Sequence, residues 1–100
     1  MIFDQPKGRV WLCTKPTDMR KSYTGLQALV RNELKQKPID GDFFIFIIRR
    51  KYQLKILYFE RNGYCIWSKR LEQGQFKSTA NTSSSQELTW IELKLLLEGI

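Results

Sequence analysis

Cationic side chains interleaved with aromatic rings are the residues in this sequence whose types and spacing could do chemistry. The 100 residues include 17 Lys and Arg against 10 Asp and Glu, a formal net charge of +7. Residues 49–77 alone hold eight basic and two acidic residues, with three tyrosines and a tryptophan among them. Basic groups neutralise phosphates and aromatic rings stack on bases, so the pattern favours a nucleic-acid partner. A sheet edge protected by Lys and Arg against aggregation remains an alternative.

The candidate DNA-binding residues come from this segment and from the start of a predicted helix. Arg20 and Lys21 fall in the first helical turn, where the helix dipole disfavours cations, so a bound phosphate would explain their placement. Compensation by the neighbouring Asp18, or exposure to solvent, would explain it equally well. Side-chain alternation does not place all the charges on one face, because a single bulge changes the parity of a strand. The full set is Arg20, Lys21, Arg49, Arg50, Lys51, Lys55, Arg61, Lys69, Arg70 and Lys77.

Catalytic and metal-binding constellations are not recognisable in the sequence. The chain has no histidine, which excludes Ser-His-Asp and Cys-His catalytic units and His-containing zinc sites. The carboxylates of Asp4, Asp18, Asp40, Asp42 and Glu60 lack a spacing typical of a two-metal site. We therefore predict no enzymatic activity, no metal or other cofactor, and no small-molecule substrate.

The two cysteines and the hydropathy pattern bear on the compartment. Cys13 and Cys65 show no CxxC spacing and are too few for a disulfide framework, so we expect two reduced thiols on strands. No run approaches the ~20 apolar residues that span a bilayer, and the N-terminus lacks the apolar core of a signal peptide. We expect a cytoplasmic protein without membrane contact.

Four runs of β-forming residues predict the strands that carry these groups, at 10–13, 43–48, 54–60 and 64–71, with a short edge strand at 76–78. The unbroken apolar run from Phe43 to Ile48 is typical of a central strand covered on both faces. Between the third and fourth runs, Asn62 and Gly63 tolerate the positive φ of a type I′ turn and predict a hairpin.

Two helices are predicted around these strands. Thr17 and Asp18 form an N-cap signal before a stripe of apolar residues with helical spacing, and Pro38 ends this helix by about residue 37. Thr89 and Glu92 have capping-box spacing at the start of a C-terminal helix, and Gly99 is a candidate C-cap.

The order of these elements predicts an α+β fold. We expect an antiparallel β-meander of three to five strands, with the N-terminal-half helix and the C-terminal helix both packed on one face. All 100 residues form one predicted domain. Residues 1–8 are expected to be loose, and residues 78–87 to be a polar linker to the C-terminal helix.

Three blocks of sequence carry a resemblance to a known family. They are PTDMRK at 16–21 with GL at 25–26, LKILY at 54–58 followed by NG at 62–63 and WSKRLE at 67–72, and LTW at 88–90 with LLEG at 96–99. In this order and spacing the chain, from about residue 9 to its end, resembles the small accessory protein of bacterial insertion sequence sixty-six elements. That protein is the TnpB-type, or second open-reading-frame, protein.

The resemblance implies a cytoplasmic, non-catalytic helper that is encoded beside a separate transposase. It supplies no catalytic residues. We therefore expect an accessory protein that assists transposition by binding DNA, either element ends or DNA in general, through the basic hairpin region. The alternative is an adaptor that docks on the element's transposase without direct DNA contact.

Overall fold

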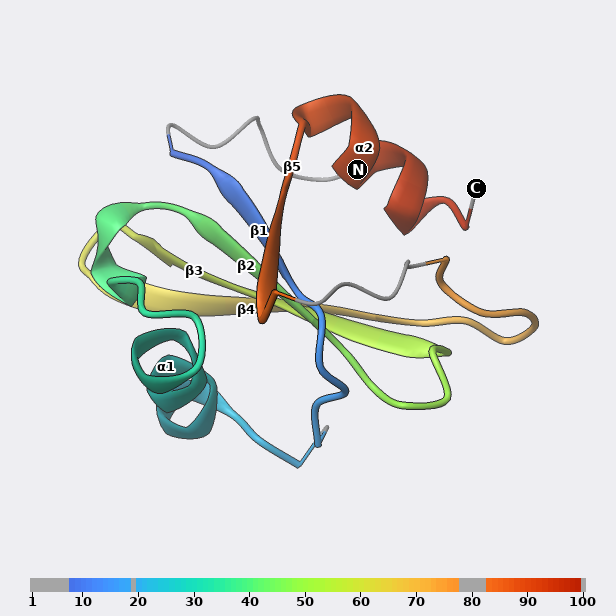
Figure 1. Ribbon diagram of the computed structural model, residues 1–100, viewed down its shortest axis with the longest axis horizontal. Coiled ribbons are helices and arrows are strands. Elements are labelled where there is room, and N and C mark those ends of the chain that lie inside the picture. Colours follow the sequence, from blue (N-terminus) through green and yellow to red (C-terminus); the bar gives the residue numbers. More distant parts are fainter. Residues whose placement is uncertain (1–7, 19, 78–82, 100) are drawn as a thin grey trace.

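A five-stranded sheet forms the centre of the molecule (Figure 1). The computed structural model describes residues 8–18, 20–77 and 83–99, so most of the N-terminus predicted to be loose lies outside it. The strand order is β4-β3-β2-β1-β5, and all neighbours are antiparallel except β1 and β2. The strands are β1 (Val10–Cys13), β2 (Phe43–Ile47), β3 (Gln53–Glu60), β4 (Gly63–Arg70) and β5 (Ser85–Leu88). With its two helices, this sheet confirms the α+β fold.

The central strand β2 is buried along its whole length, as its unbroken apolar sequence predicts. Its side chains alternate between the two faces of the sheet. Phe43, Ile45 and Ile47 join one hydrophobic cluster, and Phe44 and Phe46 join the other. Each face of the sheet therefore needs its own cover.

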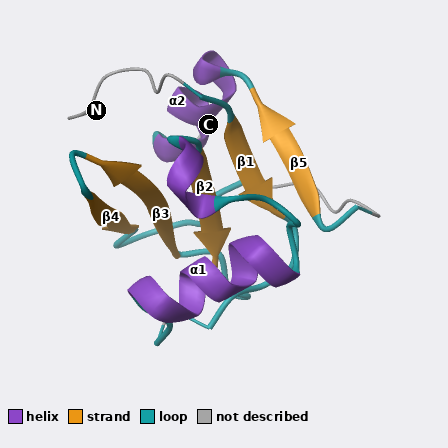
Figure 2. Ribbon diagram, turned by 90° about the vertical axis from the view of Figure 1, so that its left-hand side faces the viewer, coloured by secondary structure: helices purple, strands orange, loops and turns teal. Residues whose placement is uncertain are grey.

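The two helices supply that cover from opposite sides (Figure 2). Helix α1 (Tyr23–Asn32) packs Leu26 and Val30 against Phe44 and Phe46. Helix α2 (Trp90–Leu97) packs on the other face, where its buried residues are Leu93, Leu96 and Leu97. The expectation that both helices share one face is thus wrong. A single helical layer would leave half of the β2 side chains in water.

Helix α1 is shorter than its apolar stripe predicts, because both flanking segments are held by other contacts. The buried Thr17 donates its backbone N–H to Ile47 O at 3.0 Å, which keeps this segment extended beyond the end of β2. The N-cap is consequently Ser22, and not Thr17 or Asp18. The helix ends at Asn32, before residue 37, and Lys35 follows with a φ of 56°. Pro38 then begins a short 3₁₀ helix, η1 (Pro38–Asp40).

The β3–β4 hairpin forms as predicted, with its turn one residue earlier. Glu60 pairs with Gly63, so the two loop residues are Arg61 (φ 51°) and Asn62 (φ 69°), both in the left-handed region of a type I′ turn. This register aligns Leu57 with Ile66. A shift of one residue would move the apolar side chains of β4 to the opposite face.

The segment after β4 differs most from the sequence prediction. Phe76 is not part of an edge strand. Its fully buried ring packs into the cluster beneath α2 instead. Ser85–Leu88 form β5 along the free edge of β1, where a polar linker over 78–87 was expected. Residues 78–82, which include the end of the predicted edge strand, lie outside the described residues.

The ends of α2 match the sequence signals. Thr89 Oγ1 accepts a bond from Glu92 N at 3.1 Å, and Glu92 Oε1 accepts one from Thr89 N at 2.9 Å, which completes the capping box. Gly99 follows the helix with a φ of 78°. Cys13 and Cys65 are free thiols on β1 and β4, as predicted. Neither helix in the described part of the chain has the length and apolar character needed to cross a bilayer.

We expect Phe76→Ala to lower the free energy of unfolding by about 3–5 kcal/mol, because it empties a fully buried aromatic site. Urea denaturation followed by circular dichroism measures this change. Ile39→Ala is the matched control, since Ile39 is 56% exposed, and it should alter stability by less than about 0.5 kcal/mol. Equal, small effects of both variants would show that Phe76 does not anchor the loop after β4.

Candidate nucleic-acid interface

Three segments that are distant in sequence meet where β2 ends and β3 begins. The bond from Thr17 N to Ile47 O ties the segment before α1 to the end of β2. From β3, Lys55 Nζ donates to Lys21 O at 2.9 Å and holds the same segment at a second point. Arg20 and Lys21 are thereby placed beside the strands that carry the basic turn.

The turn between β2 and β3 is tied equally closely to the loop that follows β4. Leu71 N donates to Tyr52 O at 2.7 Å, and Phe76 N donates to Lys51 O at 2.6 Å. Gln75 Nε2 also donates to Arg50 O at 2.9 Å. Figure 1 shows these two connections side by side at one end of the sheet, opposite the β3–β4 turn.

These contacts bring together eight of the ten residues predicted to bind DNA, and we call this group the basic end. All are exposed except Lys51 and Lys55, which are half-buried. Two of the acidic residues, Asp18 and Glu72, lie in the same segments. The basic end comprises Arg20, Lys21, Arg49, Arg50, Lys51, Lys55, Arg70 and Lys77.

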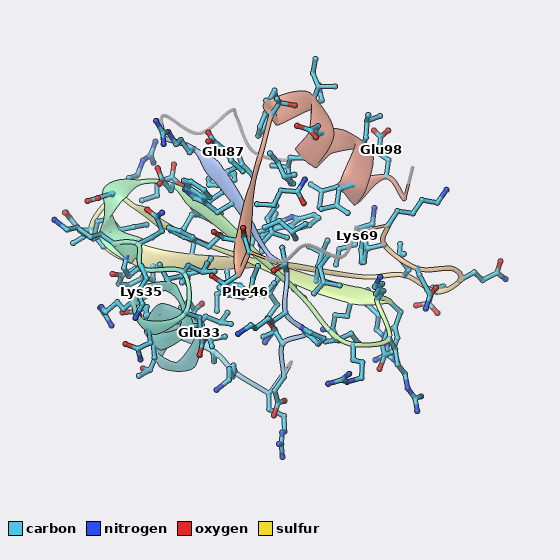
Figure 3. All side chains as sticks on the ribbon, in the orientation of Figure 1. Glu33, Lys35, Phe46, Lys69, Glu87 and Glu98 are labelled. Carbon is cyan, nitrogen blue, oxygen red and sulfur yellow. The ribbon has the colours of Figure 1, made fainter. Side chains whose placement is uncertain are left out.

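Two predicted residues lie elsewhere. Arg61 occupies the β3–β4 turn, beyond Gly63, which itself lies roughly 24 Å along β4 from Arg70 at about 3.4 Å per residue. Lys69 projects from the opposite face of β4, and its Nζ donates to Leu97 O at 2.7 Å. Figure 3 shows Lys69 near the C-terminal end of α2, where a cation stabilises the last carbonyl groups. Lys69 therefore has a structural role, which the sequence could not show without knowledge of how α2 packs.

The arrangement around Arg20 differs from the one predicted. Because α1 starts only at Tyr23, neither Arg20 nor Lys21 lies in its first turn, and the argument for a phosphate at the helix terminus no longer applies. Arg20 instead forms a two-pronged ion pair with Asp18, with Nη2–Oδ2 at 2.7 Å and Nε–Oδ1 at 3.1 Å. Hydrogen bonding from Arg20 lowers the pKa of the Asp18 carboxyl to about 2.

The aromatic residues of the hairpin pack within the protein. Tyr58 lies against Phe43, with ring centroids 4.9 Å apart, and Phe59 lies edge-on to Tyr64 at 5.0 Å. Trp67 is half-buried against the cluster beneath α2. At the basic end, the guanidinium of Arg70 lies over the ring of Tyr52, 5.2 Å from its centroid. The interleaved rings therefore support the strands, and cations dominate the exposed surface of the basic end.

Two of the carboxylates considered above for metal binding have structural roles. Asp42 Oδ1 accepts the backbone N–H of Arg9 at 2.9 Å, and its Oδ2 accepts Trp11 Nε1 at 3.1 Å. Asp18 pairs with Arg20. Across the described ranges, no group of three Cys, Asp or Glu residues is placed to hold a metal ion.

An open cleft of about 300 Å³ lies between the start of β1 and the start of α2. Its walls include Arg9, Glu87 and Trp90. Arg9 and Glu87 already form an ion pair at 3.7 Å, and Arg9 also donates its backbone N–H to Asp42. The charged walls of this cleft are thus paired with each other.

The Asp18–Arg20 pair makes a pH-dependent prediction. Because the folded-state pKa of Asp18 is about 2, below its ordinary value of 3.8, the pair stabilises the fold above about pH 4 and this stabilisation is lost as the pH falls through about 2. We expect Arg20→Gln to return the pKa of Asp18 toward 3.8, measured by NMR titration of the carboxyl carbon. Lys21→Gln is the matched control and should move this pKa much less, because Lys21 is the weakest of the causes that lower it. An unchanged pKa in Arg20→Gln would contradict the pairing.

Comparisons with known proteins agree with the sequence resemblance. The uncharacterized protein y4hO of Sinorhizobium fredii is 35% identical over 92 residues, which cover 92% of this chain and 80% of that protein. The uncharacterized protein y4jC of the same organism is 32% identical over 92 residues, covering 92% and 79% of the two chains. No solved structure matches the chain. The family model described as IS66 Orf2 like protein matches residues 8–100. The chain therefore belongs to the IS66 Orf2-like family, the accessory proteins of IS66 transposition.

Proposed function

We propose that this accessory protein assists transposition by contacting DNA through the basic end. The observation that carries the proposal is the meeting of three basic segments, 20–21, 49–55 and 70–77, that the sequence keeps far apart. A protein that neutralises several phosphates releases their condensed counterions, which gives affinity without reading sequence. A cluster of mostly exposed Arg and Lys with few acids fits this mode of binding.

The packing of the aromatic rings refines which nucleic acid is favoured. Stacking on unpaired bases needs exposed rings, whereas Tyr58, Tyr64 and Trp67 are half-buried among other side chains. Contacts from the basic end to the duplex backbone need only exposed cations. The proposal is therefore a phosphate-directed interaction with duplex DNA, with little dependence on base sequence.

Replacing Arg49, Arg50 and Lys51 together by Ala should reduce DNA affinity at least about tenfold, because three cations leave the basic end. The slope of log K against log salt should become less steep by about 2 to 3, roughly one for each lost phosphate contact. Fluorescence anisotropy with labelled duplexes, with and without element ends, measures both quantities.

Arg61→Ala is the matched control, since it removes an exposed cation of the same hairpin outside the basic end. It should change the affinity by less than about threefold. A triple variant that binds like the wild type, or an Arg61→Ala variant that weakens binding as much as the triple variant, would contradict the proposed surface. Wild-type protein with no detectable binding at low salt would contradict DNA contact altogether.

A second candidate function is an adaptor that docks on the transposase of the element, and the outer side of α2 favours it. Ile91 is 68% exposed and Leu95 is 42% exposed, and they lie one helical turn apart on the same side of α2. The segment from residue 78 onward also carries three Glu against one Lys, in a chain that is otherwise basic. An apolar stripe with acidic neighbours suits a protein partner better than DNA.

Ile91→Ser combined with Leu95→Ser tests the adaptor candidate. Both side chains are exposed, so stability should change by less than about 0.5 kcal/mol for each substitution. If α2 is the docking surface, the double variant should lose most of its co-purification with the transposase after nuclease treatment. The Arg49/Arg50/Lys51→Ala variant should retain it. The reverse pattern would place any docking on the basic end and contradict a role for α2.

A further inference from the structure

Among the described residues, the 63–68 part of the outer edge strand β4 shows few of the features that normally protect an edge strand. β4 is the last strand on its side of the sheet and has eight residues. Its stretch 63–68, GYCIWS, contains no charged residue, proline or described bulge. Natural edge strands are usually short, charged or covered, because an open edge is a template for another strand. The opposite edge, β5, follows this rule with four residues and the Glu87–Arg9 ion pair.

The hydrogen-bond pattern shows which backbone groups form this edge. Leu71 N donates to Tyr52 O, and pairs in an antiparallel ladder alternate between bonded and non-bonded positions. The odd-numbered residues of β4 therefore exchange backbone bonds with β3. The N–H and C=O groups of Tyr64, Ile66, Ser68 and Arg70 point outward, away from β3.

We propose that β4 pairs antiparallel with β4 of a second copy of this chain, with Trp67 opposite Trp67 of the second copy. The pairing joins the two sheets into one continuous sheet. It brings the outward groups of Tyr64 and Ile66 to those of Arg70 and Ser68 of the second copy. By the two-fold symmetry the same bonds form twice, about eight in all. The proposal rests on the strand edge alone and does not depend on DNA binding.

Charge complementarity between the Arg61 turn and Glu72 supports a second copy as the occupant, and charge placement favours this register over the two alternatives below. Tyr64 lies opposite Arg70 of the second copy, and Arg70 already packs on a tyrosine ring within its own chain. The Arg61 turn comes near Glu72 of the second copy. An antiparallel register centred on Cys65 would instead place Arg61 opposite Lys69 of the second copy, which sets like charges together. Parallel pairing would set the Lys69–Arg70 pair of one copy beside the same pair of the other. Antiparallel pairing about Trp67 separates those pairs by roughly 17 Å along the strands.

Sedimentation equilibrium of the full chain tests the pairing. The wild type should dimerise reversibly, and Ser68→Pro should raise the dimer dissociation constant at least about tenfold, because each copy loses one outward N–H donor. Proline is compatible with an edge strand at a position whose N–H faces outward. Ser68→Ala is the matched control, since it also removes the bond from Ser68 Oγ to Leu54 O but keeps the N–H. It should change the constant by less than about threefold.

A wild type that stays monomeric at millimolar concentration would overturn the proposal, as would equal dimerisation of Ser68→Pro with an unchanged circular dichroism spectrum. Should Ser68→Pro unfold, disulfide trapping still decides the matter. In the proposed register Cys65 faces residue 69 of the second copy in a non-bonded pair, about 4.5 Å apart at Cα, which a disulfide can span.

Lys69→Cys should therefore give a covalent dimer with oxidised glutathione, through bonds between Cys65 and the new thiol. Within one chain these two positions lie about 13 Å apart along β4, too far for a bond. Wild-type protein and Lys69→Ser should remain monomeric on a denaturing gel. Failure of Lys69→Cys to cross-link would overturn the proposed register. Equal cross-linking of the wild type would also overturn it, because that result requires a register centred on Cys65.

Discussion

The burial of β2 on both faces is the constraint on which the rest of the structure depends. The five consecutive apolar side chains of β2 alternate between the two faces of the sheet, so both faces must be shielded from water. Helix α1 covers one face and α2 covers the other. Strand β2 pairs with β1 on one side and with β3 on the other. Because β1 and β2 are parallel, the chain between them must cross over the sheet, and α1 lies in this connection. The fold therefore has three layers: α1, the sheet and α2.

The same constraint determines where charge can lie. Cations cannot enter either cluster, so they collect where β2 and β3 leave the covered region and the backbone turns. The backbone N–H of Thr17 donates to Ile47 O at the end of β2. This bond places Arg20 and Lys21 near the turn that carries Arg49 and Arg50. The basic end is thus a consequence of how the core strands terminate, with charges supplied from three separate segments.

The elements and the surface were predictable from sequence to different degrees. The unbroken run of β2, the capping box at Thr89 and the hairpin all have local causes, and each was predicted nearly to the residue. The late start of α1 was not, because the bond from Thr17 to Ile47 joins residues 30 positions apart and overrides the local cap signal. β5 was missed because its polar side chains give no strand pattern, and only the free edge of β1 makes it a strand. For the same reason the sequence suggested ten DNA-binding candidates without showing which would meet.

Lys69 and Arg70 show how neighbouring charges acquire different roles. Side chains alternate along β4, so one of the two cations must face α2 and the other must face away from it. Lys69 caps the carbonyl end of α2, whereas Arg70 packs over Tyr52 at the basic end. The α2 side carries Glu92 and Glu98 against Lys94, whereas Arg70 shares the other face with Lys55, so charge is distributed unevenly between the two faces. An uneven charge distribution orients a protein as it approaches a polyanion. The alternation of side chains along β4 therefore contributes both to the stability of α2 and to the orientation in which the protein would approach DNA.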